Sequence, residues 1–390
     1  MRRLLLALSS VLVVACSNVL GYDDIQFESE DGGAGAPGGG AGGGSSGGGA
    51  AGAPLGGAAG GGAVGGVAGS SSGGSGAVGG GSGGATSGGG GGTPSGGGTT
   101  SGGGTGSGGA PSGGGGTSSG GSGGGATGVC ARWKADRADM SEGTWSGSVA
   151  SCNAGDISAN GRANALKIVN LYRFLTGMPE VTNSASMDAS AQACALMMDA
   201  NNSLSHTPPS SWQCYTATGA GSAGKSNIAT TPGVAAVDLY MADPGNSTTI
   251  GHRRWILSNS LGPIGLGTTN TYSCMQVIGG SGSAGKPFVA FPPGGEVPIQ
   301  MFTASYTSLD STGWTIQSDS ISLSGAQVTV TDAGAAKPVT VTQLQSGYGS
   351  THAIRFNPQG WTTQAGHTYS VSVSGTSQPI SYEVKVVSCN

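Results

Sequence analysis

Two of the four histidines, His206 and His252, are placed where they could share a site. His206 ends the run 204–206 (LSH), and His252 lies in the run 251–257 (GHRRWIL), in the middle of the part of the sequence that has the composition of a folded protein. Two imidazoles that converge with a carboxylate could hold Zn²⁺ or another borderline divalent cation and leave one coordination position open. The alternative is that His206 is a polar residue at the end of a loop and His252 a helix-start residue bonded to backbone.

Other polar groups in the same region have weaker claims. Arg253 and Arg254 could contact anionic groups, but such a pair more often faces solvent or fixes a carboxylate such as Asp243. His352 and His367 lie in a β-rich tail, where we expect exposed strand or turn positions. A Ser-His-Asp triad cannot be assigned, and no GxSxG nucleophile elbow occurs in the part of the sequence expected to fold.

The segment Gly219–Ser226 fits the Walker A pattern. A phosphate-binding loop needs a buried strand before it and a helix N-terminus after it. Here residues 210–218 are polar, and residues 228–233 are β-branched and interrupted by proline. We therefore interpret the match as chance in a glycine-rich chain, expect no nucleotide, and place the segment in a loop before a strand at Asn227-Ile228.

Three helices are expected ahead of the run 251–257. Residues 162–176 and 187–201 carry apolar side chains at helical spacing, and a third helix opens with Thr231 as N-cap and Pro232 in its first turn and runs to about residue 242. In the second helix we interpret one stripe as core packing, formed by Met187, Ala191, Cys194 and Met198. From residue 264 onward short strands predominate, and we expect them at 272–278, 288–291, 327–331, 338–344, 353–356, 369–373 and 381–387. Their spacing predicts a β-sandwich for roughly the last hundred residues.

The first 16 residues have the features of an export signal. Arg2 and Arg3 precede a short apolar run, and residues 13–16 (VVAC) resemble a bacterial lipobox. The resemblance implies that Cys16 is acylated and anchors the protein in a membrane, and Ser17 after it favours the outer membrane of a double-membrane bacterium. The alternative is an ordinary signal peptide with a stray cysteine. Residues 17–128 are so rich in glycine and serine that we expect a disordered tether without a core.

Six cysteines remain after Cys16, and an even number in an exported protein predicts disulfides. They are Cys130, Cys152, Cys194, Cys214, Cys274 and Cys389. We expect nearest neighbours to pair among the first four, and Cys274 to pair with Cys389. The net charge of −4 and the absence of a basic patch in the sequence argue against nucleic acid as a partner.

Five short motifs follow one another in a distinctive order: Asn170-x-x-Arg173, Met197-Met198 ahead of Leu204-Ser205-His206, Asn227-Ile228-Ala229, Gly251-His252-Arg253 and Ile264-Gly265-x-Gly267. This order, with His252 placed 13 positions before Gly265, resembles the CAP superfamily of cysteine-rich secretory proteins, antigen 5 and pathogenesis-related proteins. The likeness covers about residues 159–291.

The resemblance implies an α-β-α sandwich with a groove that commonly carries two histidines and two acidic residues and in some members binds a divalent metal. The histidines fall on His206 and His252, and one acidic position falls on Asp243, three residues after Tyr240. The other acidic position falls on Ser226, ahead of Asn227. A hydroxyl cannot replace a carboxylate as a general base, so this set departs from the family's pattern.

We therefore expect an α+β protein with a signal peptide (1–16), a tether (17–128), a CAP-like domain with an irregular, disulfide-pinned lead-in (129–292) and a β-sandwich (293–390) that serves as a spacer or brace. The expected function is binding of a small apolar or cell-wall-derived ligand in a groove lined by His206, His252, Asp243, Ser226 and Asn227, with Zn²⁺ or another divalent cation as a candidate cofactor. The alternatives are a hydrolase that uses a metal-bound water, and a structural or adhesive surface protein with a vestigial site.

Overall fold

The computed structural model describes residues 128–390. The expected signal segment with Cys16, and the glycine-rich segment as far as residue 127, lie outside the described residues. Within 128–390 the chain folds into helices and three sheets, which is the expected α+β class.

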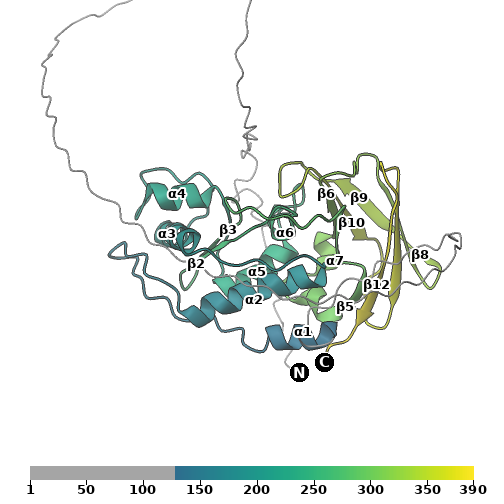
Figure 1. The fold of residues 1–390 in the computed structure, drawn as a ribbon, viewed down its shortest axis with the longest axis horizontal. Coiled ribbons are helices and arrows are strands. Elements are labelled where there is room, and N and C mark those ends of the chain that lie inside the picture. The colour runs from purple at the N-terminus through teal and green to yellow at the C-terminus, as the bar shows by residue number, and fades with distance from the viewer. Residues whose placement is uncertain (1–127) are drawn as a thin grey trace, which may run out of the picture. The chain divides into compact units, whose positions relative to one another are not determined.

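A three-stranded antiparallel sheet with strand order β1-β3-β2 lies between two layers of helices (Figure 1). Its strands are β1 (Ser226–Ala229), β2 (Gly265–Thr268) and β3 (Ser273–Gln276). Helices α3 and α4 pack on one face, where Met197, Ile228 and Cys274 share a core. Helices α2 and α5 pack on the other face, where Ile168, Val237 and Met275 belong to the main core. This arrangement is the expected α-β-α sandwich.

Helices α2, α3 and α5 agree with the three that the sequence predicts, within a few residues at each end. The described helices are α1 (Val129–Asp136), α2 (Ala159–Leu175), α3 (Ala185–Asn201), α4 (Ala217–Ala223), α5 (Gly233–Ala242), α6 (Gly251–Ile256), α7 (Leu309–Thr312) and the 3₁₀ helix η1 (Ile299–Thr303). The stripe on α3 is core as predicted at Ala191, Cys194 and Met198, which are fully buried, whereas Met187 at its start is half-buried.

The N-terminus of α5 is capped from a distance, whereas the sequence predicts a cap by Thr231. The carboxylate of Glu142 accepts hydrogen bonds from the backbone N–H groups of Val234 (2.6 Å) and Ala235 (2.7 Å). A negative side chain at this end of a helix satisfies orphan N–H groups and matches the helix dipole. The lead-in is therefore fixed to the helix layer through Glu142.

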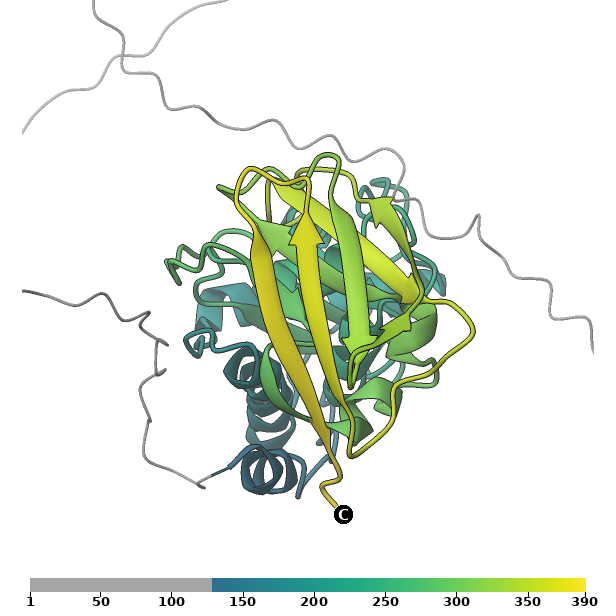
Figure 2. The ribbon, with the colours of Figure 1, turned by 90° about the vertical axis from the view of Figure 1, so that its right-hand side faces the viewer.

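Two further sheets, with strand orders β4-β6-β10-β9 and β5-β12-β11-β7-β8, form the expected C-terminal sandwich. Figure 2 shows the larger of them facing the viewer. Trp314 lies in the core between the sheets, 5.8 Å from Phe356 and 5.9 Å from Tyr369 between ring centroids. The strands are β4 (Val289–Phe291), β5 (Gly295–Pro298), β6 (Trp314–Ser318), β7 (Gln327–Asp332), β8 (Ala335–Lys337), β9 (Val339–Gln343), β10 (His352–Pro358), β11 (Thr368–Ser374) and β12 (Ile380–Val387).

The segment Gly219–Ser226 lies mostly in α4, which precedes β1, so the predicted loop is wrong there. Thr216 caps α4, because its hydroxyl accepts a hydrogen bond from the Gly219 N–H at 3.0 Å. The order here is helix followed by strand, the reverse of the strand, loop and helix that a phosphate-binding loop requires.

The lead-in is not irregular throughout, because Val129–Asp136 forms helix α1. This helix is stabilised by tertiary contacts that the local sequence does not show. Trp133 is buried, packs edge-on against Tyr172 at 6.4 Å, and lies under the guanidinium of Arg137.

All six expected cysteines form disulfides, but the expected pairing is wrong at every bond. The pairs are Cys130–Cys389, Cys152–Cys214 and Cys194–Cys274. Nearest-neighbour pairing assumes that segments close in sequence also pack together. Here α3 packs across β3, which brings Cys194 to Cys274, and α1 lies beside the C-terminus, as Figures 1 and 2 both show.

Loss of the Cys130–Cys389 bond should lower the free energy of unfolding by roughly 2–5 kcal/mol, because in the chain-entropy model a disulfide restricts the unfolded chain more as the closed loop lengthens. This bond spans 259 residues, whereas Cys152–Cys214 spans 62. Replacing both cysteines of each pair by serine and comparing urea unfolding should show a loss about 1 kcal/mol smaller for the shorter loop. A larger loss for the Cys152–Cys214 pair would contradict this account.

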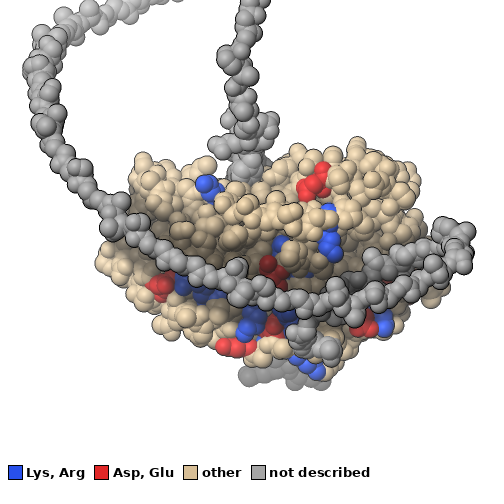
Figure 3. Space-filling model, in the orientation of Figure 1, with Lys and Arg blue, Asp and Glu red and all other residues tan. Residues whose placement is uncertain are grey.

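The surface carries few charges. Figure 3 shows mostly uncharged residues among the described atoms of the face it presents. In the described part, none of the helices has both the length and the apolar character needed to cross a membrane.

Candidate functional site

Asp243 fixes the position of His252. Asp243 ends α5 in the left-handed conformation (φ 54°), which aspartate tolerates better than most residues, and its side chain returns to the first turn of α6. The buried carboxylate accepts hydrogen bonds from His252 Nδ1 (2.8 Å), the His252 backbone N–H (3.0 Å) and Asn246 Nδ2 (2.6 Å). A carboxylate can only accept, so His252 carries its proton on Nδ1.

The ring of His252 packs on Tyr240, with 4.9 Å between centroids. The hydroxyl of Tyr240 lies 3.0 Å from Ser273 Oγ and donates to the backbone carbonyl of Asn227 at 3.1 Å. Helix α5, strand β1 and strand β3 therefore hold the imidazole in one orientation.

His206 is held in a similar way from the opposite side. It follows α3 in a loop, and its Nδ1 donates to the backbone carbonyl of Ala223, the last residue of α4, at 2.8 Å. Burial, with a smaller contribution from the neighbouring His252, lowers the pKa of His206 to about 4, against the opposing effect of the hydrogen bond to the Ala223 carbonyl. His206 is therefore a neutral ring at physiological pH, with its proton on Nδ1.

The two histidines line one cavity of about 20 Å³, which is room for about one water molecule. Ser226 and Asn227 line it too, and its apolar walls include Trp255, Val277, Ile278 and Tyr348. The structure thus brings together four of the five residues expected in the groove. The fifth, Asp243, acts on this cavity through His252.

Ser226 and Asn227 have mainly structural contacts. The hydroxyl of Ser226 donates to the backbone carbonyl of Ser222 in α4 at 2.7 Å. The side chain of Asn227 donates to the backbone carbonyl of His252 at 3.2 Å and so ties β1 to α6. Neither group supplies the second carboxylate of the family's pattern.

A second cavity, of about 110 Å³, lies on another side of His252. Its walls are largely apolar, with Leu204, Ile228, Ala229 and Leu239, and its polar lining includes His252, Asp243 and Asn246. Tyr306, which is 81% exposed, also lines this cavity and comes from the segment after η1. His252 is shared by both cavities.

Of the two roles considered for Arg253 and Arg254, facing solvent is wrong, because both are fully buried. Arg253 donates to the backbone carbonyls of Met241 (2.6 Å) and Gly313 (2.7 Å). Arg254 donates to the backbone carbonyls of Gln345 (2.6 Å) and of Ser350 (3.0 Å). The pair therefore joins α6 to the C-terminal sandwich. Burial lowers the pKa of each guanidinium to about 10, so both stay charged at neutral pH.

The donor groups do not fit a resident catalytic zinc. Such sites use three protein ligands, whereas the carboxylate of Asp243 is occupied by His252, backbone N–H groups and Asn246. Among residues 128–390, no group of three or more His, Cys, Asp or Glu side chains is placed to hold a metal ion. Two imidazoles that each donate from Nδ1 could still serve as weak cation ligands through Nε2.

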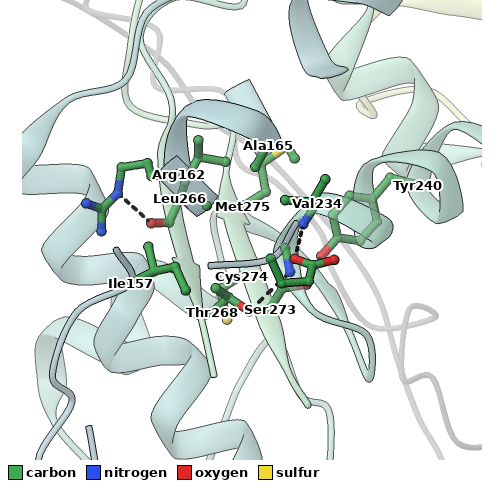
Figure 4. A pocket seen from close by; sticks show the side chains of 14 residues that line it. Ile157, Arg162, Ala165, Val234, Tyr240, Leu266, Thr268, Ser273, Cys274 and Met275 are labelled. Carbon is green, nitrogen blue, oxygen red and sulfur yellow. Dashed lines mark hydrogen bonds between the residues drawn. The ribbon is translucent and has the colours of Figure 1, made fainter. Parts of the chain in front are cut away.

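A third cavity, also about 20 Å³, lies between α2, α5 and the central sheet and is drawn in Figure 4. Arg162 donates to the backbone carbonyl of Leu266 on one side of it, and Val234 and Tyr240 lie on the other. Neither His206 nor His252 lines it, and Cys274 in its wall is bound in a disulfide. We interpret it as a packing gap.

Lowering the pH from 6.5 to 4 should reduce the free energy of unfolding by about 3 kcal/mol through His206 alone. In this window the histidine of the unfolded chain binds a proton, whereas the ring in the folded protein stays neutral. The contribution of His206 to the free energy of unfolding is therefore complete above pH 6.5 and is lost as the pH falls toward 4. His206→Asn keeps a donor for Ala223 and removes the titration. Urea unfolding at several pH values should show a shallower loss in the variant, and equal slopes would refute the role of His206.

The comparisons with known proteins agree with this geometry. The family model described as the cysteine-rich secretory protein family (CAP) matches residues 166–278. No curated protein and no solved structure matches the chain. The matched segment contains α3, the three-stranded sheet, both histidines and Asp243. Residues 166–278 therefore form a domain of the cysteine-rich secretory protein (CAP) family.

Proposed function

We propose that this CAP domain is a binding module that takes a small apolar ligand in the 110 Å³ cavity beside His252. The observation that carries the proposal is the composition of that cavity, in which a largely apolar wall meets one oriented imidazole. Binding sites for small molecules commonly combine apolar walls with a few fixed polar groups. The ligand's apolar part would pack on Ile228 and Leu239, and an acceptor or donor on it would meet His252.

The size of the cavity limits the ligand to a short chain or a single ring. An octanoate chain represents the lipid-derived class, and N-acetylmuramyl dipeptide represents the cell-wall-derived class. We expect octanoate to bind, because the walls near Ile228 offer apolar contact and few donors for a sugar.

Saturation-transfer NMR on the full chain tests this. Transfer to the octanoate methylene protons is expected in the wild type and should weaken at least tenfold in Thr230→Trp, which places a large ring at an exposed position of the cavity wall. Tyr215→Ala, which removes an exposed ring outside this cavity, is the matched control. Equal transfer in Thr230→Trp, or transfer to the muramyl peptide alone, would overturn the proposal for this ligand class.

The metal-dependent hydrolase has less support than the binding module, because its third protein ligand is committed elsewhere. Zinc in the purified chain should be well below one ion per chain. One zinc ion per chain in the wild type, lost in His206→Asn, would favour the hydrolase over the binding module.

The disulfides and the CAP domain indicate an extracellular protein. We further infer that Cys16, outside the described residues, is acylated and anchors the chain in the outer membrane. The full chain should fractionate with membranes, and Cys16→Ala should release it. Membrane association that persists in Cys16→Ala would exclude this anchor.

A further inference from the structure

A residue of the C-terminal sandwich lines the cavity between His206 and His252. Tyr348 lies in the loop 344–351, which connects β9 to β10, and it is only 6% exposed. In the described part of the chain, the other residues that line this cavity all lie between positions 206 and 278. The wall formed by Tyr348 is therefore an addition from outside the segment matched by the CAP family model.

Arg254 holds this loop in place. Its guanidinium lies 5.8 Å from the centroid of the Tyr348 ring and donates to the Gln345 carbonyl and to both the carbonyl and the hydroxyl of Ser350. The backbone N–H of Gln345 donates in turn to the Thr248 carbonyl at 3.0 Å. A buried guanidinium with several acceptors is costly to disturb, so these contacts fix the loop on α6.

Two glycines allow the close approach. A Cβ atom at Gly251 would lie 2.8 Å from Tyr348 Cδ1, and one at Gly349 would lie 2.6 Å from the backbone oxygen of Arg254. Gly349 also has a φ of 71°, in the left-handed region that favours glycine. The loop and α6 thus meet backbone to backbone, and the tyrosine ring fits over Gly251 at the edge of the cavity.

We propose that Tyr348 is a specificity-determining residue of the CAP site, supplied by the β-sandwich. With the loop 344–351 in place, the remaining 20 Å³ admits a single water-sized species to His206. A larger molecule reaches His206 only when the tyrosine ring moves away. The assignment deepens the proposed function, because His252 lines both this small cavity and the apolar cavity beside it.

Histidine labelling with diethyl pyrocarbonate on the full chain tests this at neutral pH. The chain has four histidines, and His367, whose side chain is 40% exposed, serves as an internal reference. His206 should react slowly in the wild type. Tyr348→Ala should raise its rate at least tenfold relative to His367, Tyr348→Leu should raise it by a smaller factor, and Tyr348→Phe should leave it unchanged.

Tyr306→Ala is the matched control, since Tyr306 lines the apolar cavity and not the one that contains His206. Circular dichroism and thermal unfolding show which variants are folded, and the leucine variant gives the answer if the alanine variant does not fold. An unchanged His206 rate in either folded variant, or an equal increase in Tyr306→Ala, would overturn the proposal. The labelling uses no apolar ligand, so failure of octanoate binding alone removes the proposed function and leaves the role of Tyr348 intact.

Discussion

Replacing Arg253 by methionine should lower the free energy of unfolding by about 4 kcal/mol, because it leaves several buried carbonyls without a donor. The fully buried guanidinium donates to the carbonyls of Met241, Ala242 and Gly313. Each buried acceptor that loses its partner costs about 1–3 kcal/mol, and methionine fills most of the volume, so little of the loss comes from a cavity. Methionine carries no charge, so the variant avoids the desolvation penalty of a buried guanidinium, and this offsets part of the cost.

Urea unfolding monitored by tryptophan fluorescence measures the effect of Arg253→Met. Arg355→Met is the matched control, because Arg355 lies on strand β10 and donates a long hydrogen bond of 3.4 Å to the Thr312 carbonyl. It should cost less than about 1 kcal/mol. A similar loss in both variants would mean that the contacts of Arg253 are not the cause.

Replacing Asp243 by asparagine should cost about 3 kcal/mol, although the two side chains have the same shape. Asparagine tolerates the left-handed backbone at this position, so the change tests charge and acceptor capacity alone. Its NH₂ group must face a donor, either His252 Nδ1, the His252 N–H or Asn246 Nδ2. The new NH₂ group and the N–H group that it faces are then two buried donors without an acceptor between them, which is unfavourable.

Two measurements follow the Asp243→Asn variant. Urea unfolding gives the loss of stability, and ¹⁵N shifts of the His252 ring report whether the proton leaves Nδ1, as we expect. Asp319→Asn is the control, since Asp319 is exposed and accepts from Asn259 at 3.0 Å. A loss below about 0.5 kcal/mol in Asp243→Asn, with the Nδ1 proton retained, would show that the carboxylate does not orient His252.

The periodic segments could be predicted from the sequence because they bury one face. The stripe through Ala191, Cys194 and Met198 packs α3 on the sheet. The position of α3 in turn determines where the following loop, with His206, begins. The meeting of His206 and His252 followed from the order of the CAP motifs, since 46 residues separate them and no local pattern links them.

The features that could not be predicted depend on partners far away in the chain. Arginines such as Arg253 and Arg254 are exposed in most proteins, and the carbonyls that bury them, at Gly313, Gln345 and Ser350, have no signature in a sequence. The disulfide pairing likewise depends on which layers touch. Tyr348 belongs to the same class, because its place beside the histidines is set by how the sandwich packs on α6.

The bond between Cys130 and Cys389 has a mechanical consequence. The described part of the chain runs from residue 128 to residue 390, and this bond lies within two residues of each end. The two ends are therefore covalently linked to each other. A force applied between Val129 and the C-terminal residue passes through the Cys130–Cys389 disulfide. It therefore does not stretch the polypeptide between these two cysteines. A protease that cuts an exposed turn between Cys130 and Cys389 opens this ring without releasing a fragment, because the disulfide keeps the two pieces joined.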